Sequence, residues 1–156
     1  MIDELEQIIC DWLKVKATYK GSAGVDITAV GPFEDLEDRN AIVTLQEPCQ
    51  QGALNKSMRN KVNLVTAGGS ITFLFRRYDE DAKTIEDAED RNSVVPDVVF
   101  GNLLKDNRLS GKIPGVINPV YLTSDRRLLM EVNSVIYYLS RLDFQYKGPW
   151  IYSKNG

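Results

Sequence analysis

Apolar side chains recur at spacings of three and four through the first residues of the chain, which is the period of one helix face. Asp3 can cap the start of such a helix, with Glu6 three residues later as in a capping box. The pattern ends at Lys20-Gly21, where glycine can close the helix. The sequence therefore predicts an N-terminal helix with an apolar face of Ile2, Leu5, Ile8, Ile9, Trp12 and Leu13.

Alternation of apolar and polar residues predicts several strands after this helix. Residues 25–30 and 40–46 are two candidates, and residues 70–78 are the clearest, with Phe73 and Phe75 on one face. We expect residues 61–66 to pair with 70–78 through a short hairpin at Ala67-Gly68-Gly69. The polar stretch 50–60 has no period, so it is interpreted as a long loop.

A helical segment is predicted over residues 80–105. It begins in an acidic block, residues 79–90, through which Ala82, Ile85 and Ala88 keep a helical spacing. Pro96 is expected to break or restart this helix, because its ring does not fit a helix interior. Val99 and Leu103 belong to an apolar face that continues beyond it.

The last third of the chain is rich in β-branched and aromatic residues. Residues 116–123 predict a strand that Pro119 confines to a sheet edge. Residues 127–132 and 135–146 predict a hairpin whose turn is Asn133-Ser134. The second strand is apolar on both faces, so we expect helices or another subunit to cover both sides. A helix over residues 128–142 is the second interpretation of this region.

The elements together predict one α+β domain over residues 1–156. Its sheet is expected to be mixed and mainly antiparallel, flanked by the N-terminal helix and the second helical segment. A chain of 156 residues is long enough to form a hydrophobic core that is stable without disulfides or metals. The residues expected in that core are Ile8, Trp12, Phe73, Phe75, Ile136 and Phe144.

Composition narrows the function classes. The chain has no histidine, which disfavours histidine-based catalysis and the common metal sites. Its net charge of −3 disfavours a protein that coats nucleic acid without sequence preference, because such proteins usually need a basic surface. Cys49 is a candidate nucleophile without a visible base, and a divalent cation could bind Asp79, Asp81 and Asp87, although a solvated helix face explains these acids better. We therefore expect no enzymatic activity, no cofactor and no bound metal.

The start of the chain is acidic, unlike a signal peptide, and no apolar run is long enough to cross a membrane. We expect synthesis in a reducing compartment, with Cys10 and Cys49 as free thiols; one disulfide between them is the alternative.

Residues 70–78, with the helix that follows from Glu80, and the aromatic hairpin over 129–146 resemble the tail terminator and minor tail-completion (neck) proteins of long-tailed bacteriophages. This resemblance implies a ring, usually of six copies, that caps the head-proximal end of the tail tube and joins it to the neck. It implies as partners the tail tube protein and a neck or head-completion protein, with DNA only as passing cargo. It also implies a virion protein made in the host cytoplasm, with no cofactor and no membrane.

Three alternatives stay open beside this resemblance. The chain could be another phage head-tail joining or tail tube subunit, or a small adaptor or immunity-type binding protein. A small enzyme with a carboxylate or cysteine mechanism is the third alternative. Solution mass separates an assembling subunit from a monomeric or dimeric protein.

Two sets of residues are candidates for a functional surface. Carboxylates facing a ring channel would repel DNA phosphates and let the duplex pass. The candidate channel-facing acids are Asp79, Glu80, Asp81, Glu86, Asp87, Glu89 and Asp90. Residues 50–60 and 147–156 are expected to contact neighbouring subunits, and the candidates there are Gln50, Gln51, Lys56, Arg59, Trp150 and Tyr152. The alternative for residues 147–156 is that they fold back on the core of their own chain.

Overall fold

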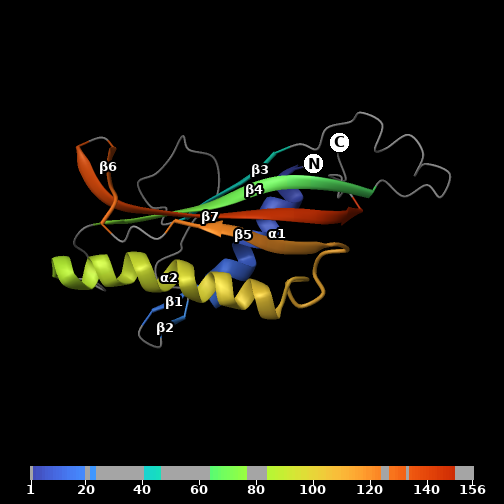
Figure 1. The fold of residues 1–156 in the computed structure, drawn as a ribbon, viewed down its shortest axis with the longest axis horizontal. Coiled ribbons are helices and arrows are strands. Elements are labelled where there is room, and N and C mark those ends of the chain that lie inside the picture. The colour runs from blue at the N-terminus through green and yellow to red at the C-terminus, as the bar shows by residue number, and fades with distance from the viewer. Residues whose placement is uncertain are drawn as a thin grey trace.

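Two helices pack on one face of a five-stranded antiparallel sheet (Figure 1). The structure, a computed structural model, describes residues 2–19, 22–23, 41–46, 64–76, 84–123, 127–132 and 134–149. The predicted α+β class is confirmed, and every strand pairing in the described residues is antiparallel. The predicted strand at 25–30 and the predicted loop at 50–60 lie outside the described residues.

Helix α1 spans Ile2–Lys16, as the 3.6-residue period predicts, and ends four residues before the expected stop. Leu5, Ile9, Trp12 and Leu13 are buried on its inner face. Two short strands, β1 (Thr18–Tyr19) and β2 (Ser22–Ala23), follow it and pair with each other. The helix therefore buries the apolar face that the sequence pattern indicates.

The five-stranded sheet is built around its last strand, β7 (Val135–Pro149). Strand β4 (Leu64–Arg76) pairs with β7 along one side, and β3 (Ala41–Leu45) pairs with β4. On the other side, β6 (Leu129–Val132) pairs with the start of β7, and β5 (Val116–Leu122) pairs with its later part. The helix interpretation of residues 128–142 is therefore wrong, because residues 129–132 and 135–149 form strands.

The hairpin and the edge strand of the last third are confirmed. Val132 pairs with Val135, so two residues form the turn, and Ser134 has the positive φ, 68°, that such turns need. Strand β5 lies at the sheet edge and its pairing is irregular between Pro119 and Tyr121, because proline has no N–H to donate.

The predicted hairpin at residues 67–69 is wrong. Strand β4 continues through these residues, and Gly68 and Gly69 pair with Gln145 and Phe144 of β7. Gly69 is needed for close packing instead of a turn: a Cβ there would lie 2.5 Å from Cζ of Phe144 and 2.9 Å from the Thr44 carbonyl oxygen.

The predicted break at Pro96 is also wrong. Helix α2 runs unbroken over Ile85–Lys105, and Pro96 lies buried in its interior. Thr84 caps the helix by accepting a hydrogen bond from the Asp87 N–H at 3.1 Å. Val95, Val99 and Leu103 are buried on the sheet, so packing offsets the cost of the proline.

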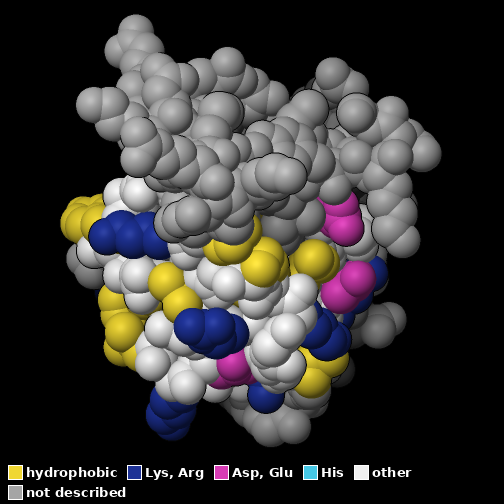
Figure 2. Space-filling view, turned by 90° about the vertical axis from the view of Figure 1, so that its right-hand side faces the viewer, with side chains coloured by type: hydrophobic (Ala, Val, Ile, Leu, Met, Phe, Trp, Pro, Cys, Tyr) yellow, Lys and Arg dark blue, Asp and Glu magenta, His cyan; other side chains and the backbone are white. Residues whose placement is uncertain are grey.

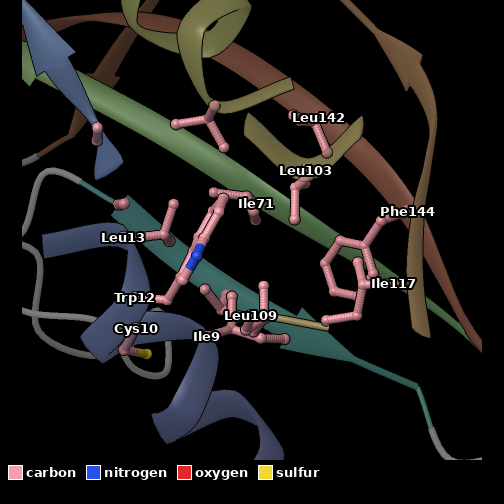
Figure 3. Packing of buried hydrophobic residues seen from close by; sticks show 14 of the residues in the cluster. Ile9, Cys10, Trp12, Leu13, Ile71, Leu103, Leu109, Ile117, Leu142 and Phe144 are labelled. Carbon is pink, nitrogen blue, oxygen red and sulfur yellow. The ribbon is translucent and has the colours of Figure 1, made fainter. Parts of the chain in front are cut away.

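The main core lies between the sheet and the two helices (Figure 3). Trp12, Phe73, Phe75 and Phe144 are buried there as predicted, and Ile8 is half-buried against the same cluster. Ile136, by contrast, is 38 % exposed, so its predicted place in the core is wrong. It lies near the tip of the hairpin, past the last described β4–β7 pair.

A second, smaller cluster lies on the opposite face of the sheet. It consists of Ile42, Leu74 and Tyr137, with Met130 and Val135 of the hairpin packed against them. The hairpin curves away from α2 at the left of Figure 1. The hairpin itself therefore supplies part of the cover for the second apolar face of β7.

Candidate assembly surface

The β6–β7 hairpin is the most distinctive surface feature of the described chain. We use the name hairpin arm for residues 129–138, which pair with each other from Leu129↔Tyr138 to Val132↔Val135. Alternation places Met130 and Tyr137 toward the small cluster and Leu129, Glu131 and Ile136 on the other side. The arm therefore has one packed face and one outward face.

The outward face of the arm carries exposed apolar side chains beside the exposed Glu131, while Tyr138 at its base is buried against Ala88. Leu129 is 46 % exposed and Ile136 is 38 % exposed, and Leu128 just before the arm is exposed as well. Exposed apolar side chains that gather in one place are a common mark of a protein–protein contact.

The start of α2 lies beside the base of the arm. Ala88 packs on Tyr138, and Arg127 forms an ion pair with Glu89 at 3.4 Å. Ile85 is exposed at the first residue of the helix, three residues before Ala88. The arm and the helix start together form one end of the molecule.

The acidic block has several environments at this end. Glu86 is exposed, Glu89 pairs with Arg127, and an oxygen of Asp90 accepts a hydrogen bond from the Tyr19 hydroxyl at 3.2 Å. Asp87 is half-buried and its N–H forms the helix cap. The candidate channel acids Asp79, Glu80 and Asp81 lie outside the described residues.

The other end of α2 is basic. Lys105, Arg108 and Lys112, which we name the basic end, are exposed, and Leu104 beside them is 64 % exposed. None of these three basic residues forms an ion pair with another described residue. Figure 2 looks onto this side of the molecule, where lysine and arginine side chains stand among hydrophobic ones.

Asp106 organises the turn that carries the basic end. It is the C-cap residue of α2, and its carboxylate accepts hydrogen bonds from the Ser110 N–H at 2.8 Å, the Ser110 hydroxyl at 3.0 Å and the Trp12 indole at 3.4 Å. The Ser110 N–H is the main reason why the pKa of Asp106 is lowered. Leu109 in the turn is fully buried, which anchors the segment to the core.

A shallow hollow of 290 Å³ lies on the sheet face opposite the helices. Its polar lining includes Gln46, Ser70 and Gln145, together with the ion pair of Arg141 and Asp143 at 2.8 Å. The two charges compensate each other, so the hollow is nearly neutral.

Chemistry by cysteine or metal has little support in the described residues. The Cys10 thiol is buried, and burial with the neighbouring Asp11 and Glu6 carboxylates raises its pKa to about 12. Such a thiol is a poor nucleophile because the thiolate is scarce at neutral pH. No group of three metal-ligating side chains occurs within the described part of the chain. Cys49 lies outside that part.

The candidate interface residues of the sequence analysis are not placed by the structure. They lie outside the described residues and are Gln50, Gln51, Lys56, Arg59, Trp150 and Tyr152. The sequence pattern predicts Ile136 in the core and leaves cover of residues 135–146 by another subunit open, so it does not single out the hairpin arm as a surface. Among the residues that the structure describes, no helix is long and apolar enough to cross a membrane.

Comparison with known proteins adds no relative: no family model, no curated protein and no solved structure matches this chain.

Proposed function

We propose that this protein is a structural virion subunit that resembles a phage tail terminator and works by assembling with copies of itself. In this proposal a ring of six copies caps the head-proximal end of the tail tube and joins it to the neck. Its partners are the tail tube protein and a neck or head-completion protein, and DNA passes through without being held. The protein is made in the host cytoplasm and ends up in the virion.

One observation supports this proposal above the others. Leu129 and Ile136 expose an apolar face on a paired hairpin whose other face is packed in the molecule. A monomer gains nothing by exposing these side chains, whereas burial in an interface removes them from water at roughly 25 cal/mol per Å². The arm therefore fits a subunit that completes its surface by assembly.

Solution mass and electron microscopy of the purified chain test the proposal. We expect a single assembly larger than a dimer, seen as rings with a central opening. The variant Leu129→Glu/Ile136→Glu places two charges on the arm and is expected to give smaller species with an unchanged circular dichroism spectrum. Val120→Glu is the control, since Val120 is also apolar and exposed but lies on β5.

The proposal makes a second demand on the same protein. Rings added to the neighbouring tube protein during its polymerisation are expected to shorten the tubes. A wild-type chain that stays monomeric at high concentration contradicts the proposed function and favours a monomeric binding protein.

A further inference from the structure

We infer that the hairpin arm of one copy docks head-to-tail on the basic end of the next copy. The inference rests on the proposed function, because it requires that the chain assembles with itself. It adds the two surfaces that meet and the symmetry that they impose.

The two surfaces are complementary in charge. The arm carries exposed Glu131, and exposed Glu86 follows Ile85 at the start of α2. The basic end carries Lys105, Arg108 and Lys112 without ion-pair partners among the described residues. Complementary charges of this kind set the orientation of a contact and speed its formation.

The two surfaces also match in apolar character. Leu129, Ile136 and Ile85 stand beside the acids, and Leu104 stands beside the bases. Exposed Arg76 and Arg127 also lie at the arm end, where Arg127 pairs with Glu89. Each surface therefore combines apolar side chains with charges that are mainly of one sign, which suits an interface with an apolar centre and a polar rim.

The position of the surfaces restricts the symmetry. They lie at opposite ends of α2, whose 21 residues span about 30 Å at 1.5 Å per residue. A two-fold contact between two arms would bring acids against acids, and one between two basic ends would bring bases against bases. Opposite charges meet in an antiparallel two-fold pair or in a head-to-tail contact, and only the head-to-tail contact repeats from copy to copy and closes into the ring of the proposed function when the rotation permits.

Charge reversal tests this contact in the full chain. The variant Glu86→Lys/Glu131→Lys makes the arm basic, and Arg108→Glu/Lys112→Glu makes the basic end acidic. Each variant alone brings like charges together at every contact, so we expect self-association to weaken at least about tenfold, or about 1.4 kcal/mol. Asp97→Lys, an exposed charge in the middle of α2, is the control and is expected to assemble as the wild type does.

Mixing the two variants is the decisive step. In the mixture every contact of an alternating ring again joins opposite charges, so assembly is expected to return, with the two variants in equal amounts. A chain with all four substitutions is expected to assemble alone but not with the wild type. Circular dichroism and thermal unfolding of each variant separate loss of contact from loss of fold.

The outcomes distinguish the inference from the proposed function. If the wild type forms rings and Arg108→Glu/Lys112→Glu forms them equally well, the head-to-tail contact is wrong while the proposed function stands. If each variant dissociates but the mixture does not reassemble, the contact is likewise wrong. A wild type that never assembles overturns both.

Discussion

Gly69 shows how one residue without a side chain fits two strands together. It faces Phe144 across the β4–β7 pairing, and the aromatic ring occupies the space in which a Cβ would lie. A Cβ added at Gly68, next to it, would have only Oε1 of Gln46 within contact distance, at 3.8 Å. The two neighbouring glycines therefore have different tolerance for alanine.

Gly69→Ala is expected to lower the free energy of unfolding by about 1–3 kcal/mol, since overpacking displaces Phe144 or the strand backbone. Gly68→Ala is the matched control and is expected to change it by less than about 0.5 kcal/mol. Urea denaturation measures both. Equal effects of the two substitutions would contradict the close approach of Phe144.

Phe73 is the best test of the strand register. It is fully buried and its ring stacks on that of Phe75, with centroids 6.2 Å apart. Phe73→Ala is expected to cost about 3–5 kcal/mol in a denaturant titration, since it leaves a cavity between the sheet and the helices. Thr72→Ala, on the other face of the same strand, is the control and is expected to cost much less.

Asp106 makes stability depend on pH. Its pKa in the folded chain is lowered from the ordinary value of 3.8, so the charged carboxylate is stabilised by folding. This contribution is complete above pH 3.8 and is lost as pH falls below 3.8 toward the lower pKa of the folded state. Asp106→Asn keeps an acceptor without the charge and is expected to cost about 1 kcal/mol at neutral pH.

The pH series is the measurement that checks this assignment. The stability difference between wild type and Asp106→Asn is expected to shrink below pH 3.8, where the aspartic acid becomes neutral. A difference that stays constant down to pH 2 would show that the carboxylate charge is not what the turn recognises.

Helix α2 is the element in which tertiary packing overrides a local preference. Pro96 has no N–H for the carbonyl four residues earlier, yet the helix continues on both sides of it. Arg91 and Asn92 attach the helix to the sheet, through the Arg76 carbonyl at 2.9 Å and the Leu139 carbonyl at 3.2 Å. These contacts and the buried apolar face hold the helix in place.

Pro96→Ala is expected to stabilise the protein by about 1 kcal/mol. Restoring a helix hydrogen bond and removing the ring gains up to about 3 kcal/mol, while losing two buried carbons costs about 1.6 kcal/mol. Thermal and urea unfolding measure the balance. A less stable variant would mean that the packing of the proline ring contributes more free energy than the restored helix hydrogen bond.

At the scale of the whole molecule, charge is separated along α2, with exposed Glu86 and Glu131 at one end and the basic end at the other. Salt screens such charges, and the Debye length falls from about 10 Å at 0.1 M to about 3 Å at 1 M. Assembly through the inferred contact is therefore expected to weaken as salt rises, by about tenfold in dissociation constant over this range. Sedimentation at several salt concentrations checks this, and an unchanged or stronger assembly would mean that charge does not guide the contact.

The sequence pattern predicts those elements that depend on local backbone geometry. These features depend only on the backbone conformation of residues that are close in the sequence. They are the period of α1, the alternation in β4 and β7, the turn at Asn133-Ser134 and the edge position of Pro119. The α+β class follows from these elements, because their apolar faces must cover one another.

Features that depend on residues far apart in the chain could not be predicted from the sequence pattern. Gly68-Gly69 predicts a turn, whereas in the folded chain Phe144 lies across from Gly69 and requires a residue without a side chain. Pro96 predicts a helix break, whereas packing of α2 on the sheet keeps the helix continuous. Ile136 has the pattern of a core residue but lies near the hairpin tip, where no described partner buries it fully. The sequence pattern indicates which side chains are apolar, whereas the residues that bury each of them are determined by long-range contacts.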